Sequence, residues 1–148
     1  MSTHRYVVNV EGAIARDGRY LMIIRGNEES HAPGVLSLPG GKVEGMGSSI
    51  SVLEETLKRE IREEVGLEVH DAMEYVESNS FIADDGEPVV DILFLCHYKG
   101  GTLAIASTGE VGAVQWMSAE EVLAHPKAPR WTRQSIQRAE KVRLEKDW

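Results

Sequence analysis

The chain has 148 residues, of which 42% are hydrophobic and 27% are charged, as in a globular domain with a sizeable core. Its net charge of −8 argues against general nucleic-acid binding, and no apolar run approaches the ~20 residues of a membrane span. Cys96 is the only cysteine, so an internal disulfide is excluded. Because the N-terminus shows no signal-peptide pattern, we expect a single cytoplasmic domain over residues 1–148.

The first part of the chain is predicted to form strands joined by tight turns. Asp17-Gly18 is a strong hairpin signal between two segments rich in apolar residues. Residues 26–34 contain several polar residues and a proline, which is typical of an exposed loop. Gly40 and Gly41 indicate a further turn, in which the backbone can approach a ligand closely. The predicted strands are residues 6–14, 20–25 and 35–38.

The rest of the chain is predicted to mix strands with helices. A helix over residues 52–65 is expected to end at Gly66, since glycine commonly closes helices in a left-handed conformation. Ser51 and Glu54 have the spacing of a capping box at its start. Further strands are predicted at 68–82, 89–98 and 111–117, with a short helix after the N-cap Ser118 and a terminal helix at 130–146. Such a mixture indicates an α/β protein with layers around one mixed sheet.

The predicted helix at 52–65 carries acidic residues where a helix should be apolar. Its apolar stripe consists of Ile50, Leu53, Leu57, Ile61 and Val65. Glu64 falls inside this stripe, Glu60 at its edge and Glu63 just beyond. Acids gathered at the margin of a core repel one another and lose hydration, so a cation that neutralises them is expected. Carboxylate oxygens suit Mg²⁺, whereas the alternative is a row of exposed acids forming pairs such as Arg59 with Glu63.

The glycine turn and this helix together resemble the conserved box of the Nudix hydrolase family. Residues matching the second half of the box are Arg59, Glu60, Ile61, Glu63, Glu64, Gly66 and Leu67, and those matching its start are Gly40, Gly41, Lys42 and Glu44. The chain departs from the pattern by four extra residues within 45–50, which place Ser51 where the family has its first glutamate.

The resemblance implies a Nudix fold, an α/β/α sandwich around a mixed β-sheet. It also implies Mg²⁺-dependent hydrolysis of a diphosphate bond in a nucleoside diphosphate linked to a group X, with Mn²⁺ as an alternative metal. Nucleoside triphosphate hydrolysis to monophosphate and pyrophosphate is the favoured reaction. The metal ligands would be the carbonyl of Gly40 and the carboxylates of Glu60, Glu63 and Glu64.

Other residues are candidates for catalysis or substrate binding. Glu63, Glu64 or Glu110 would serve as general base; Glu110 stands just before the last predicted strand, and its alternative is an exposed loop acid. Arg59 would support catalysis by pairing with Glu63 or another carboxylate of the box and orienting it. The candidates for phosphate binding are Lys42 and Arg25, and a solvated lysine is the alternative for Lys42.

Several functional alternatives remain open at this stage. The substrate could be ADP-ribose, another nucleotide sugar or a dinucleotide, although the sequence marks of those enzymes are poorly met. An isopentenyl-diphosphate-type isomerase would need a cysteine with a catalytic partner, and Cys96 lacks such a context. A non-catalytic nucleotide sensor would not be expected to keep three costly acids. We expect a small-molecule nucleotide as partner, no membrane or stable nucleic-acid partner, and leave a homodimer open.

Overall fold

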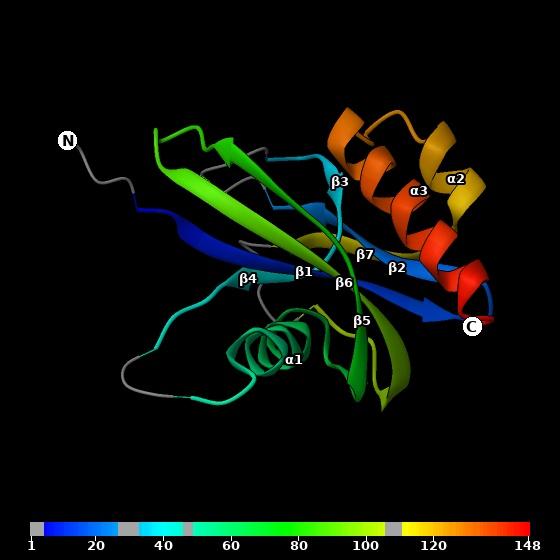
Figure 1. Ribbon diagram of the computed structural model, residues 1–148. Coiled ribbons are helices and arrows are strands. Elements are labelled where there is room, and N and C mark those ends of the chain that lie inside the picture. Colours follow the sequence, from blue (N-terminus) through cyan, green and yellow to red (C-terminus); the bar gives the residue numbers. More distant parts are fainter. Residues whose placement is uncertain (1–4, 27–32, 46–48, 106–110) are drawn as a thin grey trace.

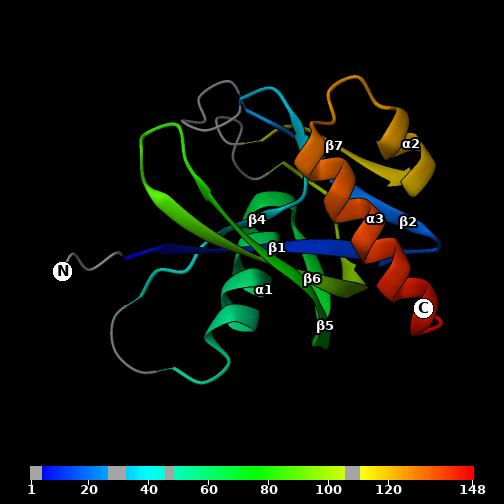
Figure 2. The ribbon, with the colours of Figure 1, turned by 45° about the horizontal axis from the view of Figure 1, so that its top comes forward.

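The computed structural model describes residues 5–26, 33–45, 49–105 and 111–148. Within these ranges a seven-stranded mixed sheet has the central order β3-β2-β1-β6-β5, with β4 paired to β1 and β7 to β2. Helix α1 covers one face of the sheet, and α2 and α3 cover the other (Figures 1 and 2). The strands are β1 (Val7–Arg16), β2 (Arg19–Arg25), β3 (Leu36–Ser37), β4 (Gly40–Lys42), β5 (Leu67–Ile82), β6 (Pro88–Gly101) and β7 (Val111–Ser118), and the helices are α1 (Val52–Val65), α2 (Ala119–Ala124) and α3 (Arg130–Glu145).

The predicted α/β layers are therefore confirmed, and so is the first hairpin. Asp17 and Gly18 both adopt positive φ, 50° and 76°, as a tight hairpin turn requires. Arg16 pairs with Arg19 across this turn. The parallel pairing of β1 with β6, beside antiparallel neighbours, makes the sheet mixed. None of the helices in the described ranges is long and apolar enough to cross a membrane.

Helix α1 has the bounds that the sequence predicts, but only one of its two ends is capped as expected. Gly66 is left-handed, with φ 74°, and its amide donates to the carbonyl of Arg62. Ser51 is also left-handed, with φ 57°, and its side chain makes no capping hydrogen bond. The predicted capping box of Ser51 and Glu54 is wrong, because this motif needs an extended N-cap backbone. Ser118 has that backbone and forms a complete capping box with Glu121.

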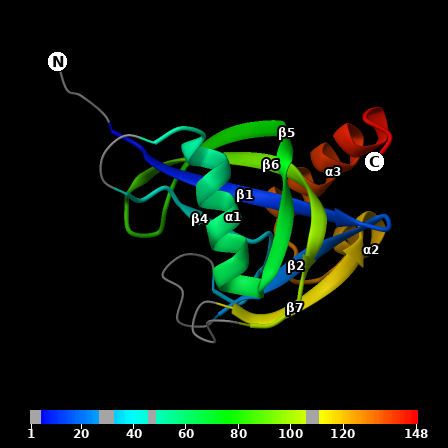
Figure 3. The same cartoon turned by 90° about the horizontal axis from the view of Figure 1, so that it is seen from below.

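The apolar stripe of α1 packs against the sheet, and seen from below the helix lies across β1 and β4 (Figure 3). Leu57, Ile61 and Val65 are fully buried in a core shared with strands β1, β2, β5 and β6. Glu64 is buried among them, as predicted. Ile50 is 91% exposed because it precedes the first turn of the helix, so its assignment to the stripe is wrong.

A second core lies on the opposite face of the sheet, beneath α2 and α3. Ile136 and Ala139 of α3 and Val122 of α2 lie there in one cluster with Ala13 and Ala15 of β1. The hydroxyl of Thr132 donates to the carbonyl of Leu36 at 2.8 Å and so ties α3 to β3. The sheet is thus covered on both faces, which fixes β1 between two helical layers.

Substituting Gly66 tests the junction between α1 and β5. A Cβ at this position would lie 2.5 Å from the carbonyl oxygen of Thr102, on a backbone with φ 74°. Gly86→Ala is the matched control, since its φ is 89° but nothing lies within 4 Å of the new Cβ. In urea denaturation we expect Gly66→Ala to lower the free energy of unfolding by at least ~2 kcal/mol and Gly86→Ala by about 1 kcal/mol. Equal losses would show that the contact with Thr102 relaxes without cost.

Candidate active site

The site begins where the glycine turn meets helix α1. Strand β4 pairs with β1 so that Gly40 lies opposite Glu11. The amide of Gly12 donates to the carbonyl of Pro39 at 2.9 Å and holds the turn against β1. From the other side, a carboxylate oxygen of Glu64 accepts a hydrogen bond of 3.0 Å from the amide of Gly40. This contact fixes a buried acid of α1 on the backbone of the turn.

Both glycines of the turn make close contacts. A Cβ at Gly40 would collide with the backbone of Val10 and Glu11, so glycine is required there. A Cβ at Gly41 would lie 2.5 Å from the carboxyl carbon of Glu60 and would displace that side chain. The bare backbone at Gly41 therefore allows Glu60 to reach the turn as well.

The three acids of α1 differ in their surroundings. The side chain of Glu64 is buried and that of Glu60 is 22% exposed, whereas Glu63 is exposed. Arg59 forms an ion pair with Glu60, with 3.6 Å between Nη2 and Oε1, and so pairs with a carboxylate of the box other than Glu63. Among the described residues, no three acids, histidines or cysteines already converge on one point. Glu60 and Glu64 approach the turn, while Glu63 stands on the solvent side of the same helix edge.

Further acidic residues, which the sequence reasoning missed, lie on the neighbouring strands. The pKa of Glu11 is raised well above its usual value, first because water is excluded from it and then because Asp91 lies beside it and hydrogen-bonds with it. The charge of Arg25 lowers this pKa somewhat, and that of Glu64 raises it further. Asp91 also accepts a 2.6 Å hydrogen bond from the side-chain amide of Asn9.

The signal for these two residues was present in the sequence. Glu11 and Asp91 are single acids inside otherwise apolar strands, and only the parallel pairing of β1 with β6 brings them together. The position of Arg25 near the site agrees with its predicted place close to the glycine turn. Lys42 is exposed at the end of β4. Glu110 lies outside the described residues.

This set of donors fits a divalent cation. Glu60 and Glu64 lie at the glycine turn and Glu11 lies beside Asp91, and the raised pKa of Glu11 reflects lost hydration and the negative charge of Asp91 and Glu64, which Arg25 offsets in part. Hard oxygen ligands of this kind are those that Mg²⁺ prefers. A cation near Glu64 would relieve part of the repulsion that acts on Glu11.

Comparison with known proteins shows the family of this chain. The family model described as NUDIX domain matches residues 3–139. The chain belongs to the Nudix family. It is therefore a Nudix-type pyrophosphohydrolase. Enzymes of this family act on nucleoside diphosphate derivatives and generally use divalent metal ions. None of the curated proteins matches the chain.

Solved structures with the Nudix fold include several close neighbours. The MutT NUDIX hydrolase from Burkholderia pseudomallei is 27% identical, with a TM-score of 0.74, over 91% of this chain and 98% of that one. The ORF135 protein of E. coli is 30% identical, with a TM-score of 0.67, over 96% and 94%. The NUDIX domain of Shewanella oneidensis NrtR, solved with ADP ribose, is 19% identical with a TM-score of 0.75, over 95% and 90%, which shows the shared fold.

Cys96 has the properties of a core thiol. It is fully buried, and burial raises its pKa to about 12. A thiol in this state is protonated and inaccessible at neutral pH, so it cannot act as a nucleophile or an acid on substrate. This argues against the isomerase alternative and agrees with the hydrolase family.

The raised pKa of Glu11 predicts a pH-dependent effect of Glu11→Gln. Below the ordinary pKa of glutamate the carboxyl is protonated in both folded and unfolded states. As the pH rises towards the folded-state pKa, the unfolded chain loses this proton first, so the wild-type protein loses stability. Glutamine is neutral throughout. We expect the free energy of unfolding of the variant to exceed that of the wild type by an amount that grows as the pH rises from about 5 towards neutrality.

The measurement is denaturation in chelator-containing buffers across this pH range. Glu120→Gln, an exposed acid on α2, is the control and should show no such divergence. A difference between Glu11→Gln and wild type that stays constant with pH would contradict the electrostatic origin.

Proposed function

We propose that this Nudix hydrolase uses Mg²⁺ to cleave a diphosphate bond in a nucleoside diphosphate linked to a group X, with nucleoside triphosphates as its preferred substrates. The observation that carries the proposal is the contact between Glu64 and the amide of Gly40. It places a buried carboxylate at a turn that lies close against both β1 and α1, because its two glycines carry no Cβ. A cation held by such carboxylates would screen the charge of a phosphate chain and let its oxygens come close to the protein.

The residues that would hold the metal are the carbonyl of Gly40 and the carboxylates of Glu60, Glu63 and Glu64. Mn²⁺ is the alternative, since it accepts the same oxygen ligands. When bound, a divalent ion screens phosphate oxygens and makes a coordinated water more acidic. The ordered position of Glu64 reduces the entropy cost of assembling these ligands.

The remaining candidates would bind substrate or move a proton. Arg25, at the end of β2, and Lys42, at the end of β4, would each neutralise a phosphate oxygen. Glu63 is exposed and so reaches solvent, which suits a base that takes a proton from the attacking water. Glu64 and Glu110 are the other candidates for this base.

Triphosphates remain the favoured substrates because the sequence marks of ADP-ribose and dinucleotide hydrolases are poorly met in this chain. The structures titled MutT NUDIX hydrolase and ORF135 protein are 27% and 30% identical, whereas the one titled ADP-ribose pyrophosphatase, from Streptococcus suis, is 22% identical. ADP-ribose and other nucleotide sugars are the second candidate, because the last of these covers 94% of the chain. The position at which many ADP-ribose hydrolases carry a proline is Ile82 here. We further propose that the enzyme acts in the cytoplasm.

A substrate panel tests the proposed reaction. The common ribo- and deoxyribonucleoside triphosphates, ADP-ribose and a UDP-sugar are incubated with the enzyme in Mg²⁺, in Mn²⁺ and in excess chelator. We expect pyrophosphate from at least one triphosphate and no turnover in chelator, since the acids cannot bind a phosphate chain without a cation between them. Faster cleavage of ADP-ribose than of every triphosphate would favour the second candidate. Metal-independent turnover would contradict the mechanism.

Neutral isosteres of the acids test their roles. Glu63→Gln and Glu64→Gln should each lower kcat/KM by at least ~10²-fold, the scale expected for a metal ligand or general base. Glu54→Gln removes an acid from the first turn of the same helix and should retain near wild-type activity. A thermal scan with and without Mg²⁺ adds a second measurement, because the stabilisation of wild type by the ion should shrink in Glu64→Gln. Full activity in both box variants would refute these assignments.

A further inference from the structure

The first part of the outer edge of β5 is protected against pairing with another strand. Strand β5 stands at one end of the sheet, and among the described strands only β6 pairs with it. Its residues 67–77 contain three register shifts and the acids Glu68, Asp71, Glu74 and Glu77. Bulges and charges of this kind keep the edges of two sheets apart.

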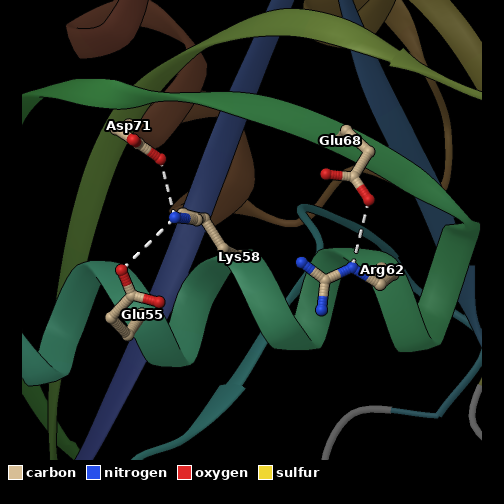
Figure 4. A network of polar contacts seen from close by, with 5 residues as sticks. All are labelled: Glu55, Lys58, Arg62, Glu68 and Asp71. Carbon is tan, nitrogen blue, oxygen red and sulfur yellow. Dashed lines mark hydrogen bonds and ion pairs between the residues drawn. The ribbon is translucent and has the colours of Figure 1, made fainter.

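Helix α1 also engages this first part. Figure 4 shows Lys58 reaching from the helix to Asp71, with a hydrogen bond of 2.7 Å. In the same view the Nε of Arg62 donates to Glu68 at 3.2 Å. The protein therefore covers and charges the part of the edge that lies beside α1.

The remaining residues of β5, 78–82, have none of these protections. They pair with β6 in an unbroken register and include no charged residue. All of them are exposed, Ile82 by 66%, and Tyr6 at the start of β1 is an exposed aromatic residue two strands away. Figure 1 shows this end of the hairpin extending beyond the helices on both faces of the sheet. A regular, uncharged strand edge of this kind is suited to pairing with another strand.

We infer that residues 78–82 pair in antiparallel orientation with the same residues of a second copy of the chain, about a two-fold axis at Ser80. A two-fold dimer uses the same surface on both copies, and an antiparallel edge is complementary to itself. In this register every directly opposed pair within the segment is uncharged, so no like charges meet. The inference concerns assembly and does not depend on the proposed hydrolysis.

The charges that flank the segment also complement one another in this register. The turn at 83–87, which carries three acids, would lie beside residues 73–77 of the other copy. The acids of β5 in that range are already paired with Arg138 and Lys146 of α3, at 3.6 Å and 3.7 Å. Both cations keep more than half of their side chains exposed. Each acidic turn would therefore meet the cations of the partner copy, and the symmetry forms this contact twice.

Sedimentation velocity at increasing protein concentration measures the dimer dissociation constant. Ser80→Lys places two like charges opposite each other at the axis and should raise this constant at least ~10-fold. Ser80→Glu should do the same. Mixed in equal amounts, the two variants should dimerise again, because each pair then joins opposite charges. Gln115→Lys adds the same charge to an exposed position of β7 and should leave the constant unchanged.

Cross-linking through Ser80→Cys gives a second measurement. The native Cys96 is fully buried and is the only cysteine of the chain, so the new thiol is the accessible one. Mild oxidation should join two copies through it, because directly opposed Cβ atoms of antiparallel strands are only about 5 Å apart. Gln115→Cys, treated in the same way, should remain largely monomeric.

The flanking charges are tested with Arg138→Gln, which should raise the dimer dissociation constant by about threefold at low salt and less at high salt. Arg133→Gln removes another exposed cation of α3 and should have no effect.

Two results would overturn the inference. A wild-type protein that stays monomeric at every concentration has no such interface, and a strand of a different protein would then be the better occupant of the edge. A dimer whose dissociation constant is the same in Ser80→Lys associates through another surface. Neither result bears on the hydrolase activity, which the substrate panel tests separately.

Discussion

The structure depends on the close approach of helix α1 to the glycine turn at Gly40 and Gly41, where the backbone carries no side chains. Glu64 reaches the amide of Gly40 because α1 lies over β4, and Glu60 occupies the space beside Gly41 that a Cβ would enter. The turn is itself held by the hydrogen bond between Gly12 and Pro39. Gly12 also faces α1, where a Cβ would lie 3.3 Å from both Ile61 and Leu57. Glycines on β1 and β4 therefore set how near the acids of α1 come to the sheet, and close packing maintains that distance.

This geometry has an electrostatic cost that the fold does not offset by itself. Glu11 and Asp91 share a hydrogen bond between neighbouring strands, and the nearby charge of Glu64 raises the pKa of Glu11 further. Arg25 compensates only in part. Groups arranged in this way reduce the stability of the folded protein at neutral pH, which is common where side chains are placed for function and not for stability. A ligand of opposite charge recovers that cost on binding, so the same repulsion that weakens the fold favours cation binding.

The parts of the structure that could be predicted from the sequence are those fixed by local chemistry. The bounds of α1, the left-handed Gly66, the hairpin at Asp17-Gly18 and the N-cap Ser118 each depend on a few adjacent residues. Ser51 and Ile50 were predicted wrongly because the helical pattern does not show that Ser51 is left-handed and that Ile50 precedes the first turn. Glu11 and Asp91 are 80 positions apart, and no periodicity within either strand indicates that β1 pairs with β6. Likewise, Arg59 forms its ion pair with Glu60 and not with Glu63, and this pairing depends on side-chain directions that the helical wheel does not give.

Helix α1 therefore has three sides with distinct tasks. Leu57, Ile61 and Val65 attach it to the sheet, Glu60 and Glu64 approach the turn, and Lys58 and Arg62 pair with acids of β5. The ion pairs to β5 are largely exposed, and such pairs contribute little to stability, so their main effect is on where charge resides around the helix. Figure 4 shows Lys58 and Arg62 in these pairs, whereas Arg59 pairs with Glu60 at the acidic edge of the helix. Because they are adjacent on one helix, any cation that binds Glu60 changes the electrostatic surroundings of Arg59 without movement of the backbone.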